Sequence, residues 1–146
     1  MLDKRKFYIN GEWVSPSKNS DFNVINPATE EPYVTISLGN EDDTNKAVDA
    51  AKNAFTTWKN TSVEERLTLL EKLLKIYKRR FDEMTQAIST ELGAPLDWAS
   101  SAQTASGESH IEDFILRLKK FEFETKFDES SDNYIAVSYT HLTLPT

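Results

Sequence analysis

The stretch SVEERLTLLEKLLKIYKRRFDEMTQAISTEL, residues 62–92, decides the fold because its apolar side chains recur every three or four positions. This spacing places them on one face of a helix. Ser62 and Glu65 have the spacing of a capping box, and Gly93 favours a helix end. We predict one continuous helix whose apolar stripe packs against its own domain, with a coiled-coil seam as the alternative. The stripe contains Leu67, Leu70, Leu74, Tyr77, Phe81, Met84 and Ile88.

Short strands are predicted before this helix. Asn10 and Gly11 lie between two aromatic and β-branched runs, which is a strong hairpin signal because both turn positions favour a positive φ. A second strand at residues 22–25 should end at the following Asn-Pro pair, since proline has no N–H for the ladder. A third strand at 34–38 alternates apolar with polar residues, which predicts that its apolar face is buried.

Two more helices flank residues 62–92. The earlier one should begin at Asn40, a good cap, and it carries three acidic residues in its first turn, where the helix dipole favours anions. The later one should run from about Pro95 to Lys120, and almost every residue between 99 and 107 is small. Small side chains permit either tight helix packing or the close approach of a ligand, and both explanations stay open. The chain is therefore expected to be α+β, with an N-terminal β-hairpin and short strands followed by three helices.

The composition excludes several functions. With 17 Lys+Arg against 24 Asp+Glu, the 146-residue chain carries a net charge of -7, so neither nucleic acid nor an anionic membrane is an expected partner. No apolar run approaches the roughly 20 residues that span a bilayer, and a signal peptide is missing, so we expect a cytoplasmic protein. Without cysteine there is no thiolate nucleophile or metal ligand, and the four isolated glycines cannot form a phosphate loop. His110 is expected to be a solvated residue.

The last ten residues, Val137 to Thr146, differ from the rest because they contain no charged side chain. They resemble the conceptual translation of a sequencing adapter derived from a transposase end. We therefore expect residues 137–146 to be a non-native tail and leave them out of the fold, together with His141.

The order of motifs resembles the aldehyde dehydrogenase superfamily from Phe7 to about Phe114. Each motif is weak alone, but the set is specific in this order and spacing. The matching pieces are Ile9–Val14 (INGEWV), Val24–Glu31 (VINPATEE), Asp49–Phe55 (DAAKNAF) with Trp58, Glu65-Arg66, and Glu91–Pro95 (ELGAP).

This resemblance implies an α/β parent enzyme with a Rossmann-like coenzyme domain, a catalytic domain and an oligomerisation flap. In that family a cysteine thiolate attacks the aldehyde, hydride passes to NAD or NADP, and water activated by a glutamate releases the acid. Residues 1–132 correspond to the N-terminal segment of the coenzyme domain, and 133–136 to the start of the flap strand. The chain would then be an inactive fragment without catalytic or cofactor-binding residues, taken from a homodimer or homotetramer.

The resemblance also implies two sites. Several family members hold a monovalent cation, K+ or Na+, through two backbone carbonyls and an acidic side chain, which here correspond to Val24, Ile25 and Glu91. The small face of the last helix would line the aldehyde entry tunnel, through Gln103, Ser106 and Gly107.

A stand-alone helical interaction module, using residues 67–88 as a partner seam, is the alternative to an enzyme fragment. A non-enzymatic member of the family is a third reading, since the position of the nucleophile is not covered. If the chain is a segment of a family member, the apolar stripe should pack on a sheet that the chain does not contain. The stripe would then be exposed in the isolated polypeptide, which is expected to aggregate.

Overall fold

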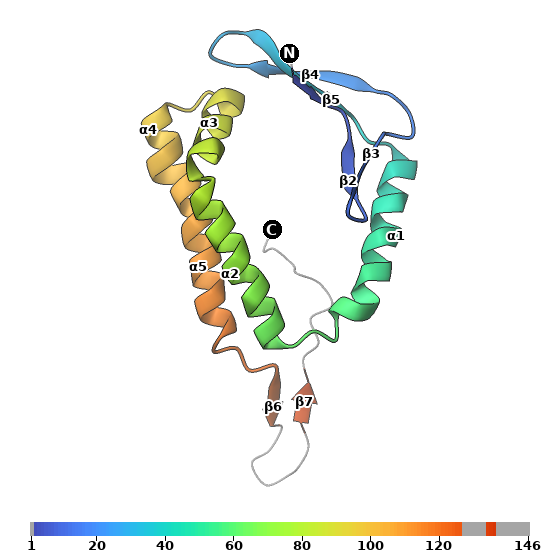
Figure 1. Cartoon of the computed structure of the whole chain (residues 1–146), viewed down its shortest axis with the longest axis vertical. Helices are drawn as coiled ribbons and strands as arrows, with labels where there is room; N and C mark the ends of the chain where they lie inside the picture. The colour runs from blue at the N-terminus through green and yellow to red at the C-terminus, as the bar shows by residue number, and fades with distance from the viewer. Residues whose placement is uncertain (1, 127–133, 137–146) are drawn as a thin grey trace.

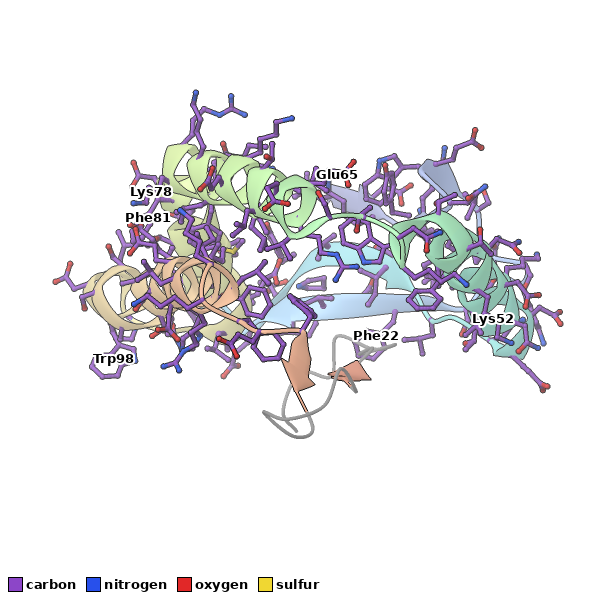
Figure 2. All side chains as sticks on the ribbon, turned by 90° about the horizontal axis from the view of Figure 1, so that it is seen from below. Phe22, Lys52, Glu65, Lys78, Phe81 and Trp98 are labelled. Carbon is purple, nitrogen blue, oxygen red and sulfur yellow. The ribbon has the colours of Figure 1, made fainter. Side chains whose placement is uncertain are left out.

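The computed structural model describes the backbone of residues 2–126 and 134–136 and the side chains of 2–123. The larger sheet lies at one end, and two helical arms run away from it towards the β6–β7 pair at the other end (Figure 1). One arm is α1 (Glu41–Trp58), and the other consists of α2 (Val63–Arg79) beside α5 (Ala105–Leu118). Seen from below, the strands lie between the two arms (Figure 2). The predicted α+β class is confirmed, while the predicted tail at 137–146 lies outside the described residues.

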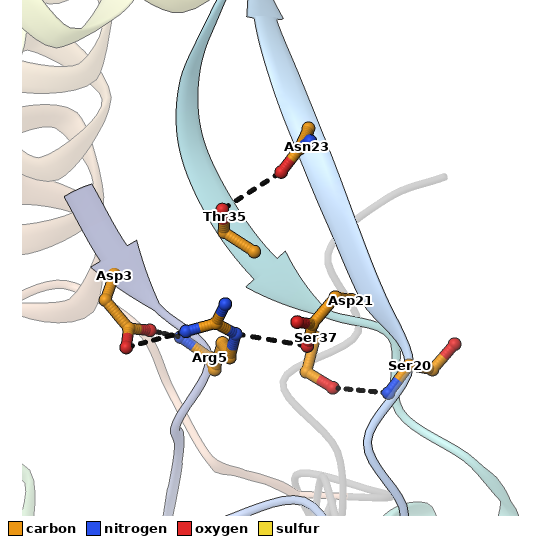
Figure 3. Close-up of polar contacts among 7 residues, drawn as sticks. All are labelled: Asp3, Arg5, Ser20, Asp21, Asn23, Thr35 and Ser37. Carbon is orange, nitrogen blue, oxygen red and sulfur yellow. Dashed lines mark hydrogen bonds and ion pairs between the residues drawn. The ribbon is translucent and has the colours of Figure 1, made fainter. Parts of the chain in front are cut away.

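The main sheet has three strands in the order β1-β5-β4. β4 (Asp21–Asn26) and β5 (Glu31–Ser37) are antiparallel, and their register shifts between Val24 and Ile25. β1 (Leu2–Lys4) pairs with β5 in parallel and was not predicted, because its partner lies some thirty residues away in the sequence. Arg5 follows β1 and forms ion pairs with Asp3 (2.8 Å) and Asp21 (3.1 Å), which link β1 to β4 (Figure 3).

The predicted hairpin is confirmed as β2 (Phe7–Ile9) and β3 (Glu12–Val14). Asn10 and Gly11 form its turn with φ of 54° and 80°, so both positions adopt the left-handed conformation that the sequence indicated. Tyr8 and Trp13 face each other across the strands, with ring centroids 5.2 Å apart.

The prediction that the alternating apolar face of the third strand is buried holds at Val34, which is 5% exposed, but not along the whole strand. The polar residues Thr35 and Ser37 are only 3% and 6% exposed, whereas Leu38 is 50% exposed. The hydroxyl of Thr35 donates to Asn23 Oδ1 (2.9 Å), and Ser37 Oγ accepts from the Ser20 N–H (3.3 Å) (Figure 3). These hydrogen bonds satisfy both hydroxyls, so burying them carries little penalty.

The helix predicted over 62–92 is divided at Arg80 into α2 and α3 (Phe81–Leu92). Its capping box of Ser62 and Glu65 is present, as is the left-handed Gly93 at its end (φ 75°). Arg80 leaves the helical conformation at φ -104° and ψ 19°. The break lets α2 pack on α5 while α3 packs on β4 and the segment 99–104. No glycine or proline marks this position.

The helix predicted from Pro95 to Lys120 comprises α4 (Leu96–Trp98), the π-helical turn η1 (Ala99–Thr104) and α5. After it, β6 (Glu124–Lys126) pairs with β7 (Tyr134–Ala136). The strand predicted from residue 133 is confirmed over 134–136, and β6 was not predicted.

Few apolar side chains are buried in the described residues. Val34, Ala99 and Ile115 are below a tenth exposed, while many larger apolar side chains are half exposed or more, among them Trp13, Phe22 and Trp98. The chain therefore leaves much of its apolar surface uncovered.

Candidate functional site

Thr104 of η1 and Gly107 of α5 lie against Tyr77 of α2. Its hydroxyl donates to the carbonyl of Thr104 (2.9 Å), and burial, with the charge of Glu108, raises the pKa of Tyr77. Thr104 is completely buried, and its hydroxyl is hydrogen bonded to that of Thr85 (2.9 Å). A Cβ added at Gly107 would collide with the hydroxyl and ring of Tyr77. Tight helix packing thus explains the small side chain at 107.

The three residues predicted to line an aldehyde tunnel have different surroundings. Gly107 faces Tyr77, and Ser106 is exposed, with its hydroxyl donating to the carbonyl of Ala102. Gln103 is half-buried, and its Oε1 is a buried acceptor without a hydrogen-bond partner among the described residues. A shallow, open groove of about 330 Å³ lies along α2 and α5, but none of the three lines it. Its lining consists of Glu71, Leu74, Glu112, Ile115, Leu116 and Lys119.

The residues predicted to hold a cation come from two elements that contact each other. Val24 and Ile25 are on β4, Glu91 is in the last turn of α3, and α3 packs on β4. The strand register shifts between Val24 and Ile25, and Ile25 pairs with Pro32, which has no N–H to donate. Glu91 is exposed. Within 2–126 and 134–136, no group of three His, Cys, Asp or Glu residues could hold a metal ion.

Asp43 is a buried carboxylate whose long-range contacts were not predicted. It is 5% exposed and accepts hydrogen bonds from the N–H groups of Ser17 (2.8 Å) and Asn40 (3.2 Å). Burial opposes its charge, but these donors outweigh burial, and the pKa of Asp43 is lowered. The signal in the sequence was its place three residues after the cap Asn40. Its contacts tie the loop after β3 to α1, which is a structural role.

The described part of the chain holds no catalytic constellation, and the sequence contains no cysteine. None of the helices in that part is long and apolar enough to cross a membrane.

The sequence matches the model of the aldehyde dehydrogenase family over residues 13–141. A relative from Staphylococcus aureus (strain bovine RF122 / ET3-1), provisionally named as an aldehyde dehydrogenase, is 44% identical over 126 residues. That match covers 86% of this chain but 26% of the relative, so the chain spans about a quarter of its length.

Solved structures show the same arrangement. An aldehyde dehydrogenase from Bartonella henselae is 52% identical, with a TM-score of 0.88 over 90% of this chain and 28% of its own. A mutant of aldehyde dehydrogenase C from Pseudomonas syringae, complexed with NAD+ and octanal, is 35% identical, with a TM-score of 0.81 over 83% of this chain and 25% of its own. By the family match and by its fold, the chain belongs to the aldehyde dehydrogenase family.

Proposed function

We propose that the chain is the N-terminal segment of an enzyme that oxidises an aldehyde to a carboxylic acid with NAD(P)+. The observation that carries the proposal is the family match over residues 13–141. The complex of the Pseudomonas syringae relative with NAD+ and octanal supports this substrate and coenzyme. The same match favours an enzyme segment over a separate interaction module.

In the parent enzyme the coenzyme would accept the hydride, and a cysteine would carry the aldehyde carbon. This chain has no cysteine, so it cannot form that covalent intermediate. Its own contribution would be structural: α2, α3 and η1 hold one another through Tyr77, Thr85 and Thr104. We propose that the chain alone is inactive.

A fusion enzyme tests this proposal. Residues 1–136 replace the matched segment of the Bartonella henselae enzyme, and NADH or NADPH formation is followed with octanal as substrate. We expect the fusion enzyme to oxidise the aldehyde and the separate chain to show no turnover. A folded fusion enzyme without activity, or turnover by the chain itself, would contradict the proposal.

We further propose a monovalent cation site, K+ or Na+, formed by the carbonyls of Val24 and Ile25 and the carboxylate of Glu91. The interrupted ladder at Val24 and Ile25 and the packing of α3 on β4 support it, and hard cations prefer such oxygen ligands. The test compares the thermal stability of the fusion enzyme with that of its Glu91→Gln variant in potassium and in lithium. Potassium should stabilise the fusion enzyme that keeps Glu91 but not its Glu91→Gln variant. Equal stability of both proteins in both salts would reject the site.

The aldehyde tunnel remains a proposal for Gln103, Ser106 and Gly107. The unpartnered Oε1 of Gln103 supports it, because a buried acceptor calls for a donor outside the described residues. Gly107→Leu is a poor test, since the new side chain would meet Tyr77. Ser106 is exposed, so Ser106→Leu is a suitable test. In the fusion enzyme this substitution should change the ratio of kcat/KM for short and long aldehydes. An unchanged ratio would count against the tunnel.

The remaining expectations also stay proposals. We propose a cytoplasmic parent enzyme that forms a homodimer or homotetramer, with β7 beginning its oligomerisation strand. The first point is supported by the described residues, in which no helix could span a membrane. The oligomerisation strand is supported by the antiparallel pairing of β7 with β6. Size-exclusion chromatography of the fusion enzyme with light scattering would reveal its oligomeric state. A monomer would contradict the proposed homodimer or homotetramer.

A further inference from the structure

The tip of the β2–β3 hairpin carries Asn10 and Gly11, the only Asn-Gly pair in the sequence. Both residues are exposed, and both have a positive φ, 54° and 80°. The hairpin is a two-stranded sheet of its own, and its turn points away from the larger sheet, alongside α1 (Figure 1). Asparagine is a thermolabile residue, and a following glycine has no Cβ to keep its main-chain nitrogen from the asparagine side chain.

The two groups that would react in this turn are not held by other contacts. Within residues 2–123, neither the side-chain amide of Asn10 nor the N–H of Gly11 has a hydrogen-bond partner. A Cβ added at Gly11 would have no atom within 4 Å, so the space beside the turn is open. Asn19 is also exposed, but the N–H of the following Ser20 donates to Ser37 Oγ (3.3 Å). The two asparagines therefore differ in how firmly the attacking nitrogen is held.

The hairpin is short enough to open locally. Its strands have three residues each, and two-stranded hairpins are only marginally stable. Tyr8 and Trp13 contact each other across the strands at 5.2 Å, but they are 63% and 66% exposed. Opening releases the main-chain torsions of Asn10, which lets the nitrogen of Gly11 reach Asn10 Cγ.

We propose that Asn10 is a site of spontaneous deamidation, and that the reaction proceeds from the opened hairpin. The nitrogen of Gly11 loses its proton to solvent and bonds to Asn10 Cγ. The Cγ–Nδ2 bond breaks, and Nδ2 leaves as ammonia with a proton from water, so that a cyclic succinimide remains. Water then adds to one of the two succinimide carbonyls and opens the ring to an aspartate or an isoaspartate. Water is the only co-reactant, and nothing is oxidised or reduced.

The two products have different consequences for the hairpin. Both add a negative charge, but an Asp-Gly pair still suits the turn. In isoaspartate the main chain passes through Cβ, which lengthens the turn by one atom and disturbs the pairing of Ile9 with Glu12. The proposal does not depend on the proposed enzymatic function, because it uses only the hairpin and solvent.

The test incubates the purified fusion enzyme at mildly alkaline pH and follows each asparagine by peptide mass spectrometry. Deamidation at Asn10 should be several-fold faster than at Asn19. Tyr8→Thr removes the aromatic contact across the hairpin and should speed the reaction at Asn10. The matched control, Phe22→Thr, removes an exposed aromatic side chain from β4 and should leave that rate unchanged.

Two further variants separate the modification from its effects. Asn10→Gly keeps a residue suited to the turn but has no amide, so it should abolish the slow acidic shift on ion exchange. Fresh Asn10→Asp should melt as the natural fusion enzyme does, whereas the isoaspartate fraction of the aged protein should melt at a lower temperature. The comparison of Asn10 with Asn19 is repeated on the full chain, which does not require the fusion enzyme to fold. Deamidation at Asn10 no faster than at Asn19 in either protein, or equal rates in Tyr8→Thr and Phe22→Thr, would overturn the proposal.

Discussion

Gly93 lies so close to Pro27 that a Cβ added at Gly93 would fall 2.7 Å from Pro27 Cγ. This contact joins the end of α3 to the residue that follows β4. Gly93 also has a φ of 75°, so both its backbone conformation and its surroundings exclude a side chain.

Gly93→Ala should therefore destabilise the fusion enzyme by roughly 2–4 kcal/mol, from left-handed strain and the steric conflict with Pro27. Gly11→Ala is the matched control: Gly11 has a φ of 80° but no atom within 4 Å of an added Cβ. It should cost only about 1 kcal/mol. Denaturant unfolding measures both, and equal losses would show that the contact with Pro27 contributes nothing.

The contact of Tyr77 with Gly107 predicts non-additive substitutions. Tyr77→Phe should cost about 1–2 kcal/mol, because the Thr104 carbonyl loses a donor. Gly107→Ala should lower the stability more when Tyr77 is present than when it is replaced by Phe. The Tyr77→Phe substitution removes the hydroxyl that lies nearest to the added Cβ. A double-mutant cycle on the melting transition of the fusion enzyme measures this difference. Strictly additive losses would contradict the described packing.

Asp43 predicts a stability that depends on acid pH. Its pKa is lowered in the folded protein, so its ionised form stabilises the fold at pH values above its unfolded pKa, about 3.9. This stability falls as the pH drops from about 5 through the lower folded pKa. Asp43→Asn should thus destabilise the fusion enzyme most at neutral pH, and the difference from the natural protein should shrink below pH 4. Asp42→Asn, exposed on the same turn, is the control. A difference that stays constant from pH 7 to 3 would be inconsistent with an ionised, hydrogen-bonded Asp43.

The isolated chain should be insoluble or molten and should not bind NAD(P)+. Few apolar side chains of residues 2–123 are buried, and large ones remain exposed on both arms. Exposed surface of this kind favours aggregation. Calorimetry and coenzyme titration of the purified chain measure both expectations. A sharp cooperative melting transition, or saturable NAD(P)+ binding, would refute this prediction.

Local signals in the sequence predicted the elements whose causes are local. The turn at Asn10 and Gly11, the cap at Asn40 and the capping box at Ser62 depend on residues within a few positions, and each is present. The family could also be predicted, since it depends on the order of motifs along the chain.

Features that depend on distant partners were missed. β1 forms only because β5 offers an edge, and Arg80 interrupts a helical pattern because α2 and α3 pack on different neighbours. Thr35 and Ser37 are buried because Asn23 and Ser20 supply hydrogen bonds from the adjoining segment. The cation site at Val24, Ile25 and Glu91 stays a prediction, and the contact of Gly107 with Tyr77 could not be found without the structure.

The π-helical turn at Ala99–Thr104 has a consequence for comparing family members. A π turn accommodates one residue more than an α-helical path of the same length, so it commonly records a single-residue insertion. In an uninterrupted α-helix an extra residue would shift every following side chain by about 100° around the axis, and the wider π turn takes up that residue. A homologue with a regular α-helix here would thus require a one-residue gap inside the helix when the two sequences are aligned. An alignment that placed its gaps only in loops would pair Ile115 with a residue facing another direction.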